Sequence, residues 1–134
     1  MAMSAEQARV MAEDYTKAWN SHDPNAVASF YSQDGRIAIN SGEPSKGRAE
    51  IADMAQAFYN DLPDLALRMD SIRTSGTHAV YLWTFKGTYS GADGPGNLVQ
   101  VSGWEYWKYS DDGLIAESSG HFDSDDYQRQ IEGA

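Results

Sequence analysis

The residue with the clearest chemical potential in this chain is a glutamate that lies within the aromatic run of residues 104–107. Alternation along residues 98–109 places Glu105 on the same strand face as Val101 and Trp107. An apolar setting disfavours an ionised carboxylate, so Glu105 would either pair with a cation or have a raised pKa. With a raised pKa it could act as an acid, a base or a hydrogen-bond donor. The alternative is a structural salt bridge or a hydrogen-bonded tie to a neighbouring strand.

The other residues that could carry chemistry give weaker signals. Tyr15 lies on the apolar face of the first predicted helix, where a tyrosine is usually core with its hydroxyl satisfied. His22, His78 and His121 lack the spacing of metal ligands, and the chain has no cysteine, so we expect no metal site and no thiolate nucleophile. The glycine-rich residues 90–97 match no nucleotide-binding pattern and indicate a hairpin loop, so we expect no cofactor.

Strand alternation also decides which side chains of the last strand could reach a pocket. If Ser118, Gly120 and Phe122 face it, His121 points away, toward solvent or a partner subunit. An acid-base pair of His121 with Asp123 is then disfavoured. Aromatic residues at helical and strand spacing could line an apolar pocket or be plain core, and these are Trp19, Tyr31, Phe58, Trp83 and Trp107.

Helix signals dominate the chain before Pro63. Ser4 can cap a first helix that ends near residues 20–22, and Asp23 followed by Pro24 is a strong start signal for a second. Each predicted helix has apolar residues at helical spacing. The elements expected in this part are helices over residues 4–20, 23–31 and 47–62, with a turn at 33–35, a short strand at 36–40 and a loop at 41–46.

From residue 65 onward the hydrophobic period changes to that of a strand. Short connections between the strands imply antiparallel neighbours, and three helices followed by a meander indicate an α+β fold with helices on one face of a sheet. An aromatic band that contains Trp104 and Tyr106 then lies on the other face and predicts a homodimer. The expected strands are Leu65–Thr74, His78–Tyr89, Leu98–Tyr109 and Leu114–Phe122.

The composition argues against several classes of function. A chain of 134 residues with 41% hydrophobic residues predicts a single domain over residues 1–134. Twenty acidic residues against ten Lys and Arg give a formal net charge of −10, which disfavours nucleic acid and anionic lipid as partners. The start lacks the apolar run of a signal peptide, and no stretch approaches the roughly 20 apolar residues of a membrane span. We therefore expect a cytoplasmic protein that does not contact the membrane.

Both ends of the chain resemble known domains. Residues 15–23 and 30–35 are similar to the opening of nuclear-transport-factor-2-like domains, and residues 113–117, 121–123 and 130–133 resemble the close of SnoaL-like polyketide cyclase domains. The resemblance implies a cone-shaped α+β fold in which three N-terminal helices pack on a strongly curved antiparallel sheet. It also implies an apolar pocket and a homodimer through the outer face of the sheet.

Carried over by position, the resemblance implies roles for individual residues. Tyr15 matches the oxyanion-hole tyrosine of the ketosteroid isomerase branch, and Glu105 falls at its protonated aspartate. The general base of that branch falls near Ile39 or Asn40, and neither is a carboxylate, which argues against steroid isomerisation. In the cyclase and epoxide hydrolase branches an aspartate does acid-base work, and its counterpart here is Gly120.

Two functions from different classes follow. As an enzyme, the chain would isomerise, cyclise or hydrolyse a small hydrophobic carbonyl or epoxide compound. Glu105 would act as acid or base, Tyr15 would bond to a carbonyl or enolate oxygen, and Asn40 would position water or substrate. As a non-catalytic binding module, the same pocket would hold a hydrophobic metabolite. The missing partner acids favour the binding module, whereas a buried carboxylate favours the enzyme, which is our leading hypothesis. In both cases the predicted lining is Trp19, Tyr31, Phe58, Trp83, Val101, Trp107, Ser118 and Phe122.

Overall fold

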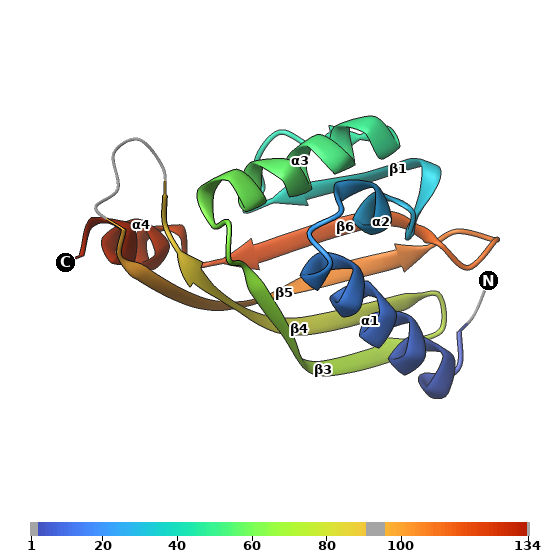
Figure 1. Ribbon diagram of the computed structural model, residues 1–134. Helices are drawn as coiled ribbons and strands as arrows, with labels where there is room; N and C mark the ends of the chain where they lie inside the picture. Colours follow the sequence, from blue (N-terminus) through green and yellow to red (C-terminus); the bar gives the residue numbers. More distant parts are fainter. Residues whose placement is uncertain (1–2, 91–95, 134) are drawn as a thin grey trace.

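The computed structural model describes residues 3–90 and 96–133 (Figure 1). Its elements are α1 (Ala5–Asn20), α2 (Pro24–Ala28), β1 (Tyr31–Ile39), β2 (Ser45–Lys46), α3 (Gly47–Asp61), β3 (Ala66–Ser75), β4 (His78–Thr88), β5 (Leu98–Tyr109), β6 (Ile115–Phe122) and α4 (Ser124–Glu132). The strands form one sheet in the order β2-β1-β6-β5-β4-β3. Helices α1, α2 and α3 lie over one face of this curved sheet, and α4 lies at its end (Figure 1).

Local sequence explains where the first two helices begin. The Ser4 hydroxyl accepts a hydrogen bond from the Gln7 amide at 3.1 Å, and the Gln7 side chain accepts one from the Ser4 amide at 3.0 Å. These reciprocal bonds form a capping box. The Asp23 side chain accepts a bond from the Asn25 amide, and Pro24 occupies the first turn of α2. Both predicted helix starts are confirmed.

The structure corrects the prediction for the segment that follows α2. Tyr31 begins β1 instead of ending a helix, and the predicted turn at residues 33–35 lies inside this strand. The turn-forming residues produce an irregularity instead, because the pairing of β1 with β6 shifts its register between Tyr31 and Arg36. Gly35 suits this tight place, since a Cβ there would lie 2.8 Å from the backbone oxygen of Ile115.

Two elements of the structure are absent from the sequence prediction. Strand β2 lies within the predicted loop at residues 41–46 and pairs antiparallel with β1. Helix α4 is capped by Asp123 and ends at Gly133, which has a left-handed φ of 77°. Only Tyr127 and Ile131 are apolar in α4, so its hydrophobic stripe is two residues long. The three predicted N-terminal helices are therefore present, and among the described residues α4 is a fourth helix that the sequence analysis misses.

The strand meander is confirmed, with one difference in pairing. Neighbouring strands from β3 to β6 are antiparallel, and their bounds differ from the predicted ones by one residue at most. Strand β1, however, runs parallel to β6. The sheet is therefore mixed, and the predicted α+β class with N-terminal helices on one sheet is confirmed. Residues 91–95 of the predicted glycine-rich loop lie outside the described residues.

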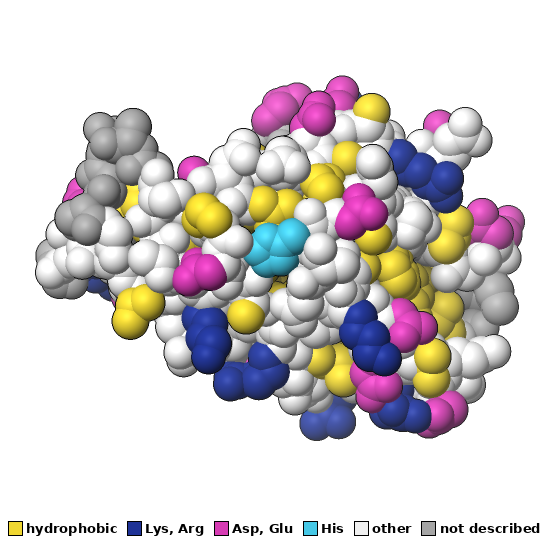
Figure 2. Space-filling view, viewed as in Figure 1, with side chains coloured by type: hydrophobic (Ala, Val, Ile, Leu, Met, Phe, Trp, Pro, Cys, Tyr) yellow, Lys and Arg dark blue, Asp and Glu magenta, His cyan; other side chains and the backbone are white. Residues whose placement is uncertain are grey.

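Alternation along β5 separates the two faces of the sheet as predicted. Val101, Glu105 and Trp107 are buried beneath the helices, whereas Trp104 and Tyr106 on the opposite face are 47% and 45% exposed. On the helix-bearing side, acidic and basic side chains are interspersed with hydrophobic ones (Figure 2). In the described part of the chain, no helix is both long and apolar enough to cross a membrane.

Candidate functional site

An apolar pocket lies between the helices and the inner face of the sheet. It comprises about 510 Å³ of empty space, part of which is open to solvent. Within the described residues, its lining contains one titratable side chain, that of Glu105. The rest of the lining is apolar or glycine and consists of Trp19, Ile37, Ile39, Met54, Phe58, Leu65, Leu67, Trp83, Phe85, Gly120 and Phe122.

Glu105 is 7% exposed, and one of its oxygens receives most of its hydrogen bonds. Oε1 accepts from the Ser118 hydroxyl at 2.8 Å and from Trp107 Nε1 at 2.9 Å. It also accepts from the hydroxyls of Tyr15 at 3.1 Å and Tyr31 at 3.4 Å. Among the described residues, Oε2 has only a 3.4 Å contact with the Tyr15 hydroxyl. A proton on this carboxyl group therefore belongs on Oε2, because donors occupy Oε1.

The two tyrosines form a hydrogen-bonded chain behind Glu105. Their hydroxyl oxygens lie 2.9 Å apart. Each hydroxyl has one proton, so when Tyr15 donates to Glu105, Tyr31 donates either to Tyr15 or, over the longer 3.4 Å contact, to Oε1. Burial raises the pKa of each tyrosine well above the usual value, and the charge of Glu105 is the second largest cause. Both tyrosines are therefore neutral hydrogen-bond donors. Neither tyrosine belongs to the pocket lining, which makes Tyr15 a positioning group for Glu105 in this structure.

Burial is the largest influence on the ionisation of Glu105. It raises the pKa of the carboxyl group, and the hydrogen bonds from Trp107, Ser118, Tyr15 and Tyr31 oppose this effect only in part. The ion pairs found among the described residues do not include Glu105. The alternative role expected for Glu105 was a structural contact with a neighbouring strand. Such a contact is present as the hydrogen bond from Ser118 of β6 to Glu105 of β5, and it is not a salt bridge. A carboxyl group with a raised pKa beside an apolar pocket can act as an acid, a base or a neutral donor.

The predicted site residues fall into distinct positions around Glu105. Those that line the pocket with it are Trp19, Phe58, Trp83 and Phe122. Those that bond to its carboxyl group from behind are Tyr15, Tyr31, Trp107 and Ser118. Val101 is buried in the core next to the lining. His121 points to the outer face, where its ring lies 5.3 Å from that of Trp104, as alternation predicts. No group of three or more His, Asp or Glu in the described ranges could hold a metal ion.

Asn40 lies outside the pocket, in the turn after β1. Its φ of 52° is in the left-handed region, which asparagine tolerates better than most residues. Its backbone amide donates to the Gly120 carbonyl at 2.8 Å, and its Oδ1 accepts from the Phe122 amide at 2.9 Å. These bonds fasten the end of β6 to the turn. Asn40 is therefore not placed to position water or substrate in the pocket.

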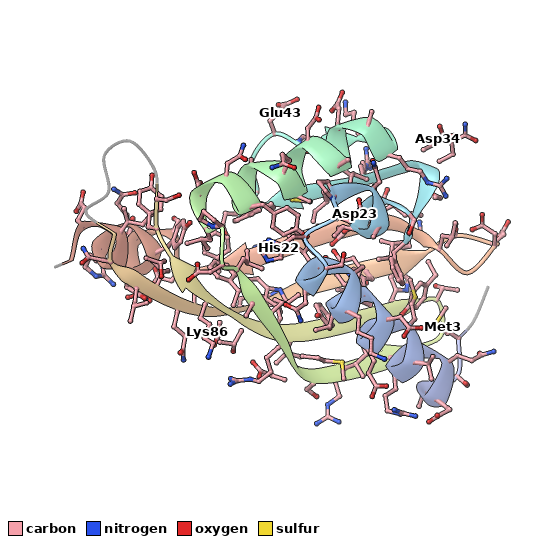
Figure 3. All side chains as sticks on the ribbon, in the orientation of Figure 1. Met3, His22, Asp23, Asp34, Glu43 and Lys86 are labelled. Carbon is pink, nitrogen blue, oxygen red and sulfur yellow. The ribbon has the colours of Figure 1, made fainter. Side chains whose placement is uncertain are left out.

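Two lining residues that the sequence analysis misses come from the β3 side. Leu65 and Leu67 reach the pocket because polar side chains at the end of α1 hold this segment in place. His22 Nε2 lies 2.7 Å from the Leu65 carbonyl, and the Asn20 amide bonds to the Leu67 backbone in both directions. Figure 3 shows His22 in the connection between α1 and α2. No local sequence pattern predicts that the end of α1 packs against the start of β3.

A glycine makes room for one aromatic wall of the pocket. A Cβ on Gly103 would lie 2.8 Å from Cζ2 of Trp83 and 2.2 Å from the backbone oxygen of His121. Phe85 stacks on Trp83 with ring centroids 5.5 Å apart and extends the wall. The sequence analysis also misses Phe85 as a lining residue, although alternation along β4 places it on the same face as Trp83.

Comparisons with known proteins give the family. Residues 12–118 match the model of the SnoaL-like domain, whereas no curated protein matches the chain. One similar solved structure is TsrD from Streptomyces laurentii, with 20% identity and a TM-score of 0.83, and the match covers 98% of this chain and 99% of that chain. Another is a candidate polyketide cyclase from Xanthomonas campestris pv. campestris, with 22% identity and a TM-score of 0.78, and this match covers 95% of this chain and 98% of that chain. A third is a hypothetical protein with a ketosteroid isomerase-like fold from Catenulispora acidiphila in complex with trimethylamine, with 15% identity, a TM-score of 0.80 and coverage of 90% and 91%.

These structural likenesses are below 25% identity and show the fold alone, which is nuclear-transport-factor-2-like. The family model, in contrast, spans most of the chain and includes Glu105 and Ser118 of the pocket cluster. The chain belongs to the SnoaL-like domain family.

Proposed function

We propose that this protein is a small-molecule enzyme in which Glu105 acts as acid and base on a small hydrophobic carbonyl or epoxide compound. The reaction class is isomerisation, cyclisation or hydrolysis. The observation that carries the proposal is that, among the described residues, one buried carboxyl group with a raised pKa lies in an otherwise apolar pocket. The candidate polyketide cyclase among the similar structures is consistent with such a substrate.

The asymmetry of the carboxyl group suggests how it would work. With Oε1 occupied by donors, a proton on Oε2 donates to the carbonyl or epoxide oxygen and stabilises the negative charge that develops there. In its ionised form, Glu105 accepts a proton from the substrate. No second titratable group lines the pocket within the described residues, so Glu105 performs both transfers. This favours substrates that need little help from a base, such as β-dicarbonyl compounds with acidic C–H groups and strained epoxides.

A second candidate function is non-catalytic binding of a hydrophobic metabolite, and two observations favour a small organic cation. Among the described residues, the pocket walls contain five aromatic side chains, whose faces attract cations, and Glu105 forms no ion pair. A structurally similar protein from Catenulispora acidiphila is described in complex with trimethylamine. In this alternative, ionised Glu105 supplies the charge that balances the ligand.

The pH dependence of binding separates the two candidates, because they require opposite forms of Glu105. Cyclohexenone accepts a hydrogen bond from the protonated form, so its affinity should fall as the pH rises through the raised pKa. Trimethylammonium pairs with the ionised form, so its affinity should rise over the same interval. Titrations that follow tryptophan fluorescence over the whole pH range in which the protein stays folded would measure both.

The same experiment includes a turnover assay with cyclic ketones, epoxides and polyketide-like esters. Turnover of one of these compounds, together with ketone affinity that falls with pH, is the result expected for the enzyme. Amine affinity that rises with pH and no turnover would establish the binding module instead. Binding of both probes that does not depend on pH would contradict both candidates.

We further propose a homodimer through the outer face of the sheet. Leu82 pairs in register with Trp104, and Trp104 with His121, so these side chains form a continuous surface across three strands. Leu82, Trp104 and Tyr106 are 37%, 47% and 45% exposed, and apolar surface of this kind is typical of interfaces.

Light scattering at micromolar concentration should give twice the chain mass for the wild type. Trp104→Lys places a charge in the centre of the proposed interface, so this variant should be monomeric. Val10→Lys is the matched control, because Val10 is an exposed hydrophobic residue on α1, away from the outer face. A monomeric wild type, or an effect of equal size in the control, would contradict the proposed interface.

A further inference from the structure

Gly120 is opposite Glu105 in the pairing of β5 with β6, and both residues line the pocket. The backbone does not require a glycine at this position. A Cβ on Gly120 would be 3.6 Å from Glu105 Cγ and 3.9 Å from both the Ala38 oxygen and Ile39 Cγ1, which are ordinary van der Waals distances. Its φ also lies outside the left-handed region. Gly120 therefore has room for a side chain that the sequence does not supply.

Gly103 shows what a structurally required glycine looks like in the same sheet. There a Cβ would lie 2.2 Å from the backbone oxygen of His121, a separation that no side chain could adopt. At Gly120 the corresponding space belongs to the pocket and borders the Glu105 side chain. The absence of a side chain at Gly120 thus leaves the pocket open directly beside the carboxyl group.

We infer that Gly120 determines specificity by letting the polar group of a ligand lie against its Cα and meet Glu105. This inference rests on the proposed function of Glu105 and narrows its substrate class. A ring ketone or an epoxide with little bulk beside its oxygen has room over Gly120. In a compound with branched substituents next to the oxygen, the substituents would overlap the β6 backbone at Gly120. The oxygen of such a compound would therefore not reach Glu105.

Gly120→Ala tests this inference with two probes of similar size. Cyclohexenone carries the oxygen that Glu105 would bind, whereas methylcyclohexene has only apolar contacts with the aromatic walls. We expect Gly120→Ala to weaken cyclohexenone binding by about tenfold or more and methylcyclohexene binding by less than about twofold. Ser119→Ala, at the neighbouring exposed position of β6, should change neither. Equal weakening of both probes, or unchanged cyclohexenone binding, would overturn the inference.

A measurement without ligand separates this inference from the proposed function. Carbon NMR with isotope-labelled glutamate can follow the titration of Glu105 in wild type, Gly120→Ala and Ser119→Ala. A methyl group 3.6 Å from Glu105 Cγ should cover part of the surface that Glu105 still exposes, so the pKa of Glu105 should rise further in Gly120→Ala and stay unchanged in Ser119→Ala. An unchanged pKa in Gly120→Ala would refute the role of Gly120.

The outcomes for the two proposals are distinct. If the wild type binds neither probe and turns over no compound, the proposed function fails, and the titration alone decides about Gly120. If Gly120→Ala does not fold, the backbone requires glycine at this position, and the inference is overturned as well. Thermal unfolding of the variant checks this before the binding measurements.

Discussion

Glu105→Gln is expected to lose turnover by about 10²-fold or more while keeping the fold. The glutamine oxygen can accept the bonds from Ser118, Trp107 and Tyr15 that Oε1 accepts in the wild type. Its amide group takes the place of Oε2 and still donates a hydrogen bond, but it neither gives up nor accepts a proton at neutral pH. The loss should therefore appear in kcat, with a smaller change in KM, for whichever compound of the panel the wild type converts.

Glu117→Gln is the matched control for this variant. Glu117 lies on the adjacent strand β6, on the outer face, where it pairs with Arg36 at 2.8 Å, and its side chain is 48% exposed. Its replacement should leave kcat unchanged. Full turnover in Glu105→Gln would show that the chemistry lies elsewhere, and equal losses in both variants would remove the special role of Glu105.

The stability of Glu105→Gln should also depend on pH in a defined direction. Because the pKa of Glu105 is raised in the folded state, the folded state binds this proton more tightly than the unfolded state. The contribution of Glu105 to the free energy of unfolding therefore falls as the pH rises from the unfolded value of about 4.3 toward the folded pKa. The variant lacks this titration, so its stability relative to wild type should increase over that interval in urea unfolding measurements.

The second large effect is expected for Gly103→Ala, which should destabilise the protein by about 2 to 3 kcal/mol or more. A Cβ at this position would lie 2.2 Å from the backbone oxygen of His121 and 2.8 Å from Trp83 Cζ2. Either the β5–β6 pairing must open or the indole must move, and the second change alters the pocket wall. Urea unfolding would measure the loss, and the emission spectrum of the tryptophans would report the change around Trp83.

Gly120→Ala provides the comparison for this prediction, since it makes the same substitution in the same sheet. At Gly120 the added Cβ has contacts of 3.6 Å and longer, so the free energy of unfolding should stay close to that of the wild type. Similar destabilisation by the two substitutions would show that the distances from the added Cβ do not decide the loss of stability. The steric argument for both glycines would then fail.

Local sequence determined the features of this protein that depend on local interactions. Ser4 and Asp23 are helix caps because their side chains bond to amides two or three residues away. Alternation along β5 put Glu105 and Trp107 on the buried face, because successive side chains of a strand point to opposite faces. The same rule correctly directed His121 outward. These predictions needed no knowledge of distant parts of the chain.

Local patterns were misleading where pairing with a distant strand overrode them. Residues 33–35 favour a turn, but hydrogen bonding to β6 keeps them in β1 and converts the turn signal into a shift of register. Helix α4 is held by its caps, by the apolar contacts of Tyr127 and Ile131, and by two hydrogen bonds between the Gln130 side chain and the Gln100 backbone in β5. Tyr127 makes one of these contacts, with Phe85 and Phe122 of the pocket wall.

Only the tertiary structure decided what surrounds the carboxyl group of Glu105. Tyr15 is 90 residues away in the chain, yet its hydroxyl reaches Oε1 at 3.1 Å because α1 packs across the sheet. Periodicity identifies the face on which a side chain lies, but the partner that it meets there depends on how the faces of distant elements pack together. For this reason Ser118, Trp107 and the tyrosines lie behind the carboxyl group, Asn40 lies in a turn outside the pocket, and the space over Gly120 is open.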